Sequence, residues 1–188
     1  MKKLLTVVAC LMAGILTAQN ASAQTNAGET QMSSKKILVA YYSYSGNTKE
    51  VAQAIHDLVG GDIFEIKADV TYPDAYRPMT EQAKREIQSK FRPVLTTQVE
   101  DMAQYDVVFL GTPNWWGTIP TQISSFLETY DLSGKTVVPF VTHGGGGKQN
   151  TVADMTAQCK GCVVEQNAWV GYGDRTSGLQ DWLKEIKI

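Results

Sequence analysis

The sequence has few cysteines, few histidines and no long basic run, and each shortage excludes a class of protein. Three cysteines and two histidines occur in 188 residues; a zinc site built on the Cys159 and Cys162 pair would need two more ligands, and with only two histidines in the chain we expect none. Lysine and arginine number 17 against 19 acidic residues, without the basic stripe that is typical of nucleic-acid binding. A Gly-x-Gly-x-x-Gly dinucleotide loop is also absent. We therefore expect no nucleic-acid partner.

The longest apolar run lies at the N-terminus and has the features of an export signal. Lys2 and Lys3 precede the run LLTVVACLMAGILTA, and ASA at residues 21–23 has the small-x-small pattern cut by signal peptidase. The run is short for a membrane span, and polar residues follow it. We therefore expect residues 1–23 to be a cleaved signal peptide and residues 24–35 a flexible leader. The mature protein is expected to be periplasmic, without stable insertion in the membrane.

Beyond the leader, the apolar pattern alternates between buried strands and amphipathic helices. Continuous apolar runs indicate buried strands, and helical spacing indicates helices. Strands are predicted at residues 35–43, 62–67, 106–112, 134–147 and 162–170. Helices are predicted at residues 47–61, 79–90, 119–130, 148–159 and 177–188, the second of them charged and exposed. This alternation predicts one α/β domain, residues 36–188, with a parallel sheet.

Three loops that follow predicted strands are unusual in composition. They read SYSGNT, TPNWWGTIP and THGGGG. Ligands of open parallel sheets bind beyond the carboxyl ends of the strands. We therefore expect these three loops to meet around one ligand.

The first of these loops, residues 43–48, has the chemistry of an anion site. Ser43, Ser45 and Thr48 offer hydroxyl donors. Gly46 allows a close approach of the backbone, and Asn47 or Thr48 can cap the following helix. Backbone amides at the start of a helix favour an anion. The loop contains no lysine or arginine. Two interpretations stay open: a phosphate held by neutral donors, or a capped turn without a ligand.

The glycine-rich third loop resembles a nucleotide P-loop only superficially. A P-loop needs a glycine, four further residues and then Gly-Lys-Ser/Thr. Thr142 stands at the place of the first glycine, and Gln149 follows Lys148. Hydrolysis of ATP or GTP is therefore excluded.

Together, the three loops resemble those of the flavodoxin family. Ser-x-Ser-Gly-Asn-Thr after the first strand is similar to the flavodoxin phosphate loop. PNWWGTIP and FVTHGGGG resemble segments of short, often secreted flavodoxin-like proteins. The resemblance covers nearly the whole mature chain. It implies a flavodoxin-like three-layer α/β sandwich with a five-stranded parallel sheet in the order 2-1-3-4-5, and FMN as the cofactor.

The resemblance also implies which residues bind FMN. The phosphate is expected in the first loop, with the second loop on one side of the flavin ring and the third beside its pyrimidine edge. These expected cofactor-binding residues are Ser43, Tyr44, Ser45, Gly46, Asn47, Thr48, Pro113, Asn114, Trp115, Trp116, Gly117, Thr142, His143, Gly144 and Gly145. One tryptophan is expected near the ring and the other against a helix, and the pattern does not say which. His143 is either a donor to the flavin or a hydrogen-bonded strand-end histidine.

The mature chain retains two cysteines, Cys159 and Cys162, in the sequence CKGC. A reactive Cys-x-x-Cys pair has its first cysteine at a helix start, whereas this pair follows a predicted helix. In an exported protein we expect a structural disulfide, with free thiols as the alternative.

The pattern favours electron transfer by an FMN protein, with a redox partner protein or a small quinone-type acceptor as its partner. Two alternatives stay open: an FMN-dependent quinone-type oxidoreductase, and a flavin-free binding module of the same fold. Export argues against a dedicated nicotinamide-dependent reductase, because such cofactors are scarce outside the cytoplasm. Tyr72, Tyr76 and Arg77 are expected to pack as ordinary loop residues rather than to border the ligand.

Overall fold

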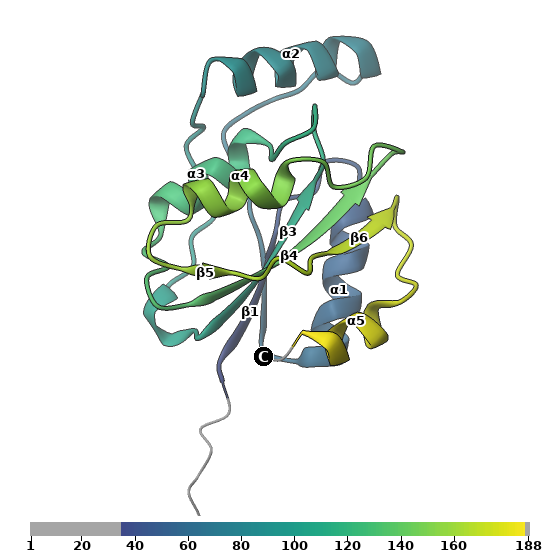
Figure 1. Ribbon diagram of the computed structural model, residues 1–188. Helices are drawn as coiled ribbons and strands as arrows, with labels where there is room; N and C mark the ends of the chain where they lie inside the picture. The colour runs from purple at the N-terminus through teal and green to yellow at the C-terminus, as the bar shows by residue number, and fades with distance from the viewer. Residues whose placement is uncertain (1–34, 187–188) are drawn as a thin grey trace, which may run out of the picture. The chain divides into compact units, whose positions relative to one another are not determined.

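Strands and helices alternate along the chain as predicted (Figure 1). The computed structural model describes residues 35–186. The predicted signal peptide, residues 1–23, lies outside this range, and so does all but the last residue of the predicted leader. No helix between residues 35 and 186 has the length and apolarity needed to cross a membrane.

A parallel sheet forms the centre of the domain (Figure 1). Its strands are β1 (Ile37–Tyr41), β2 (Asp62–Glu65), β3 (Val107–Pro113), β4 (Thr136–His143), β5 (Val163–Val164) and β6 (Trp169–Tyr172). Their order is β2-β1-β3-β4-β5, with β6 also paired to β4. All of these pairings are parallel. The predicted fold class and strand order are therefore confirmed.

The fifth position of the sheet differs from the single strand predicted at residues 162–170. Two short strands, β5 and β6, occupy this position, and residues 165–168 separate them. Polar side chains bind the backbone at the break: Gln166 Nε2 donates to Val164 O at 2.8 Å, and Asn167 N donates to Glu165 Oε1 at 2.8 Å. Such local bonds compete with the strand ladder.

Helices cover both faces of the sheet. They are α1 (Asn47–Val59) and α5 (Leu179–Glu185) on one face, and α3 (Thr121–Thr129) and α4 (Thr151–Gln158) on the other. Each face has its own apolar core. In α1, Val51, Ala52 and Ile55 are fully buried, as their helical spacing predicts. The result is the predicted three-layer arrangement.

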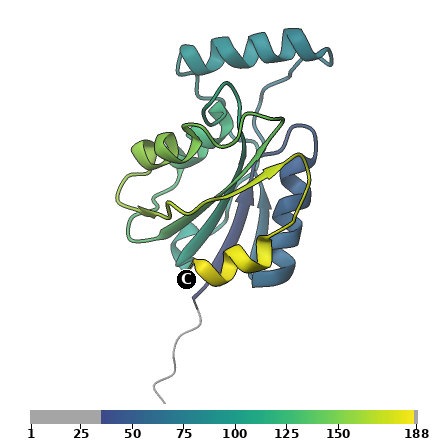
Figure 2. The same cartoon turned by 45° about the vertical axis from the view of Figure 1, so that its right-hand side comes forward.

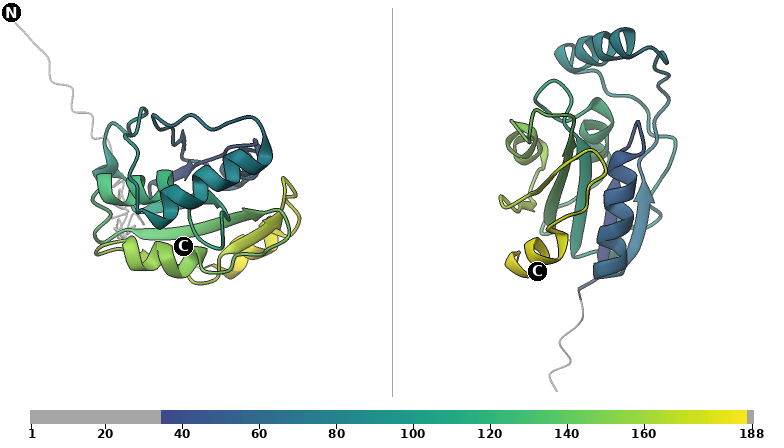
Figure 3. Two further views of the ribbon diagram at one scale, coloured as in Figure 1. Left: turned by 90° about the horizontal axis from the view of Figure 1, so that it is seen from above. Right: turned by 90° about the vertical axis from the view of Figure 1, so that its right-hand side faces the viewer.

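Helix α2 (Tyr76–Gln88) lies on neither face of the sheet. It crosses the edge at which the strands end, as the view from above shows (Figure 3, left). The prediction of an exposed helix at residues 79–90 was wrong in part. The helix begins earlier, because Pro78 is tolerated in a first turn, and it buries Met79 and Ala83.

Two limbs of chain connect α2 to the rest of the domain (Figure 2). They pair antiparallel at their base, where Ala68 lies opposite Leu95. Asp69 N donates to Val94 O at 2.9 Å, and Thr96 N donates to Lys67 O at 2.8 Å. We call these paired limbs, residues 67–69 and 94–96, the stalk.

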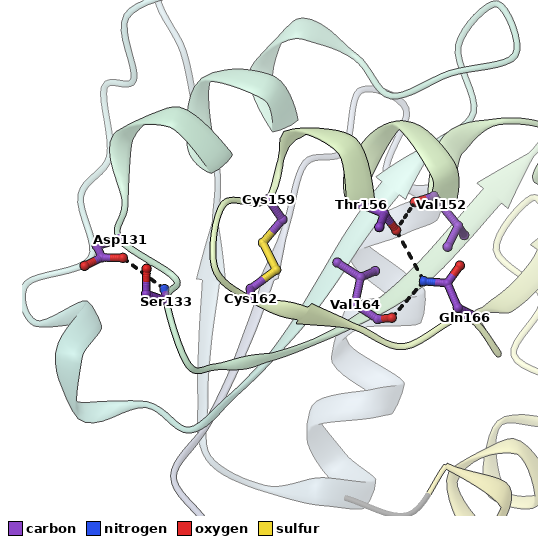
Figure 4. The surroundings of a disulfide bond; sticks show 8 residues. All are labelled: Asp131, Ser133, Val152, Thr156, Cys159, Cys162, Val164 and Gln166. Atoms are coloured by element: carbon purple, nitrogen blue, oxygen red, sulfur yellow. Dashed lines mark hydrogen bonds between the residues drawn. A yellow bond between two sulfur atoms is a disulfide. The ribbon is translucent and has the colours of Figure 1, made fainter.

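Cys159 and Cys162 form a disulfide, as expected (Figure 4). It joins the end of α4 to the segment that enters β5. Beside it, Gln166 Nε2 donates to Thr156 Oγ1 at 3.3 Å and so links α4 to the residues that follow β5.

Replacing both cysteines with alanine should lower the free energy of unfolding by about 2 kcal/mol, because a four-residue loop removes little entropy from the unfolded chain. Urea denaturation measures the change. Reducing the unaltered protein with dithiothreitol should give a similar loss. An unchanged denaturation midpoint in both experiments would show that the bond does not contribute to stability.

Candidate functional site

The three unusual loops meet at the carboxyl edge of the sheet, around a cavity of about 710 Å³. This volume is in the range of small-molecule and cofactor sites. The predicted residues that line it are Tyr44, Ser45, Asn47, Thr48, Pro113, Asn114, Trp115, Trp116, Gly117, Thr142, His143 and Gly144. Ser43, Gly46 and Gly145 belong to the same loops but do not line the cavity.

The first loop presents the start of α1 to the cavity. Gly46 has a φ of 92° and directly precedes the helix, a conformation that favours glycine. The expected cap by Asn47 or Thr48 is replaced by Ser43, whose Oγ accepts from Lys49 N at 3.3 Å. The Thr48 hydroxyl instead pairs with that of Thr142 at 2.8 Å, both residues being buried. This bond joins the first loop to the third.

The first loop and the other side chains that line the cavity are mostly uncharged. Among its lining residues that the structure describes, none is a lysine, arginine, aspartate or glutamate. The first-turn amides of α1 lack partners within the helix, and the helix dipole makes this end attractive to an anion. An anion bound here would therefore be held by hydroxyls and amides.

The second loop turns tightly and is tied to the third. Trp115 and Thr118 exchange two backbone hydrogen bonds of 3.0 Å each, and Trp116 and Gly117, between them, have φ values of 53° and 84°. Asn114 fixes the turn, because its Oδ1 accepts from Gly117 N at 2.9 Å. The Nδ2 of Asn114 donates to Gly147 O at 2.6 Å. The Asn114 side chain is thus engaged within the protein.

The two adjacent tryptophans have different environments. Trp115 is partly buried, and the rings of Tyr42, Tyr44 and Tyr72 meet it edge-on at centroid distances of 5.7, 5.9 and 5.3 Å. Trp115 therefore forms a rigid wall of the cavity.

Trp116 is 51% exposed and reaches α2. Its Nε1 donates to Thr80 O at 2.8 Å, and Lys84 Nζ lies 4.5 Å from its ring centre. Of the two tryptophans, Trp116 is thus the one that packs against a helix.

The tyrosines behind Trp115 are held neutral. Burial raises the pKa of Tyr42 and that of Tyr72 well above their ordinary value. The Tyr72 hydroxyl donates to Glu86 Oε2 at 2.5 Å and accepts from Gln122 Nε2 at 2.9 Å. These groups therefore act in packing and positioning rather than as acids or bases near neutral pH.

His143 of the third loop is the last residue of β4, and both interpretations of this residue have support. Its Nδ1 accepts from Gly145 N at 2.9 Å, so the neutral ring carries its proton on Nε2. It also lines the cavity, with Tyr172 edge-on at 5.9 Å. A Cβ on Gly144 or Gly145 would meet nothing within 4 Å, so this backbone is open to a ligand.

Sequence reasoning missed the contribution of α2. Tyr76, Met79, Thr80 and Ala83 line the cavity opposite the loops. Their spacing of three and four residues is typical of one helix face and was a usable signal. Tyr76 was expected to pack in a loop and is instead a cavity residue that is 78% exposed. Tyr72 packs as expected.

The arrangement fits FMN. A neutral nest at a helix start suits a phosphate, an indole wall suits a flat aromatic ring, and an open glycine backbone suits the polar edge of a flavin. These three features lie around one cavity.

Known structures share this fold along most of their length. The chain is 32% identical to a protein of Bacteroides eggerthii named as a flavoprotein, with a TM-score of 0.72 over 82% of this chain and 99% of that one. It is 27% identical to a flavoprotein of Lactobacillus acidophilus in complex with FMN, with a TM-score of 0.66 over 80% of this chain and 99% of that one. The FMN in this neighbour agrees with the predicted cofactor.

A curated relative matches over a shorter stretch. It is named NAD(P)H dehydrogenase (quinone), comes from Cupriavidus metallidurans, and is 33% identical over 96 residues, or 50% of this chain. The matched stretch spans 45% of that relative's length. The family model described as Flavodoxin matches residues 36–186, which include all three loops. The chain therefore belongs to the flavodoxin family.

Proposed function

We propose that this protein is an exported FMN protein that transfers electrons. The observation that carries the proposal is the mostly uncharged cavity at the carboxyl edge of the sheet, with a helix start, an indole wall and an open glycine backbone around it. Bound FMN would supply reversible uptake of one or two electrons. Export rests on the features of residues 1–23.

Different parts of the chain would hold different parts of FMN. Ser45, Asn47 and the amides that open α1 would bind the phosphate. Trp115 would support the ring. The amides near Gly144 and the Nε2 proton of His143 would face the polar edge of the ring, where added negative charge is stabilised on reduction.

Titration with FMN tests the proposal. We expect the mature protein to bind one FMN per chain and to quench its fluorescence, because aromatic side chains surround the ring site. Riboflavin, which lacks the phosphate, should bind more weakly. Unchanged flavin emission with excess protein would contradict the proposal and favour a flavin-free binding module.

The electron acceptor has two candidates, a partner protein and a small quinone-type molecule. The name of the Cupriavidus metallidurans relative and the apolar residues that α2 contributes to the cavity favour the small molecule. Stopped-flow oxidation of the reduced holoprotein separates the two. A quinone that binds in a defined site gives a rate that saturates with its concentration, whereas a pure shuttle gives a linear dependence.

A further inference from the structure

We propose that α2 is a roof that makes the flavin cavity a chamber for small, flat, apolar electron acceptors. Met79 and Ala83 would set the size of the acceptor. This inference rests on the proposed FMN function and adds the class of acceptor and the residues that select it.

The position of α2 is the first support. The helix crosses the edge of the sheet above the three loops (Figure 3, left), and it joins the domain through the stalk (Figure 2). It therefore stands opposite the loops that are suited to FMN, rather than covering a face of the sheet. A molecule that lies between α2 and those loops contacts both.

Two sets of contacts hold the roof in place. Near its middle, Thr80 O accepts the Trp116 indole N–H, and Lys84 lies over the same ring. Near its end, Glu86 accepts from Tyr72, and Tyr72 in turn accepts from Gln122 of α3. The roof is thus fastened both to the second loop and to the body of the domain.

The inner face of the roof is apolar. Met79 is 7% exposed and Ala83 is 2% exposed, and both line the cavity. Thr80 also lines it, but its hydroxyl already donates to Arg77 O at 3.0 Å. The loops therefore supply the polar groups that FMN needs, while the roof supplies a surface for a molecule without polar substituents on its faces.

None of the charged residues of α2 lines the cavity, although Lys84 lies over the ring of Trp116 and Glu86 accepts from Tyr72. Arg77, Glu81 and Arg85 are exposed and do not line the cavity. The α2 side of the chamber therefore offers no charged partner to an acceptor, which disfavours carboxylates and phosphates there and favours an uncharged ring such as a quinone.

The reaction balances with reduced FMN as the electron source. A quinone takes two electrons and two protons and becomes the hydroquinone. Both electrons come from two-electron-reduced FMN, which returns to its oxidised form. One proton comes from the reduced flavin and one from solvent. A separate electron-donor protein, or dithionite in the assay, reduces the flavin again.

Filling the chamber tests the inference. We expect Ala83→Trp to weaken the binding of menadione to the oxidised holoprotein at least tenfold, read from the perturbation of the flavin absorption band. Oxidation of the reduced holoprotein by menadione should slow by a similar factor. Arg85→Trp adds the same side chain to the outward face of α2 and should change neither value.

Enlarging the chamber gives a second, independent measurement. Met79→Ala should bind the wider ring of an anthraquinone at least threefold more tightly than the unaltered protein does. FMN affinity and melting temperature, measured for each variant, identify a variant that fails to fold. If the unaltered protein does not bind FMN, the proposed function fails. If FMN binds, and folded Ala83→Trp takes up menadione as the unaltered protein does, the roof inference alone is overturned.

Discussion

Ser45→Asp should weaken FMN binding by about 100-fold. Ser45 lines the cavity at the first loop, where the phosphate is expected and where lysine and arginine are absent from the described lining. Two like charges about 5 Å apart, at an effective dielectric constant of about 20, repel by about 3 kcal/mol. Each 1.4 kcal/mol changes a dissociation constant about tenfold.

Riboflavin separates this charge effect from a loss of structure. It has the same ring without the phosphate, so Ser45→Asp should bind it as the unaltered protein does. Ser45→Ala, which removes a hydroxyl without adding charge, should weaken FMN binding by tenfold or less. Equal loss of riboflavin and FMN in Ser45→Asp would place the phosphate outside the first loop. Fluorescence titration at constant ionic strength measures all these affinities.

Gly111→Val should lower the free energy of unfolding by about 3 kcal/mol or more. Gly111 lies in β3, in register with Tyr41 and Phe140 of the neighbouring strands. A Cβ there would collide with the Phe140 ring and lie 2.9 Å from Tyr41 Cβ. Phe140 is fully buried, so the ring has little room to move. Overpacking of a close-packed core usually costs about 1 to 3 kcal/mol, and this site is tighter than most.

Two further variants locate the cause of that loss. Gly144→Ala, at a position where a Cβ meets nothing within 4 Å, should change the stability of the flavin-free protein by about 0.5 kcal/mol or less. Adding Phe140→Leu to Gly111→Val should recover part of the loss, since the shorter side chain gives way to the new methyl groups. Urea denaturation measures each variant. A Gly111→Val protein as stable as Gly144→Ala would refute the close packing of this ring.

The alternating strands and helices and the three loops were predictable because their signals are local, whereas the sheet order followed from the resemblance to the flavodoxin family. A buried strand followed by SYSGNT or THGGGG shows where the chain leaves the sheet, and parallel strands place such ends together. The cavity that these loops line is therefore where the sequence predicts it. The break between β5 and β6 was missed because CVVEQNAWV looks continuous. The break depends on the Gln166 and Glu165 side chains, which form hydrogen bonds with nearby backbone atoms.

The position of α2 depends on contacts that no local pattern specifies. The spacing of Met79 and Ala83 indicates that one face of this helix is buried, but not what covers it. The roles of the two tryptophans were also undetermined. The structure distinguishes them by their contacts, since Trp116 bonds α2 through its indole N–H and also takes a positive φ, a conformation that few residues other than glycine adopt.

The short loop between Cys159 and Cys162 affects how the chain matures. If export removes residues 1–23, and Cys10 with them, two thiols remain and only one intramolecular pairing is possible. Oxidation after export then has no scrambled isomers to correct. Because the partners are three positions apart, the link can form before distant parts of the chain have met, so a disulfide isomerase should not speed the recovery of the native protein.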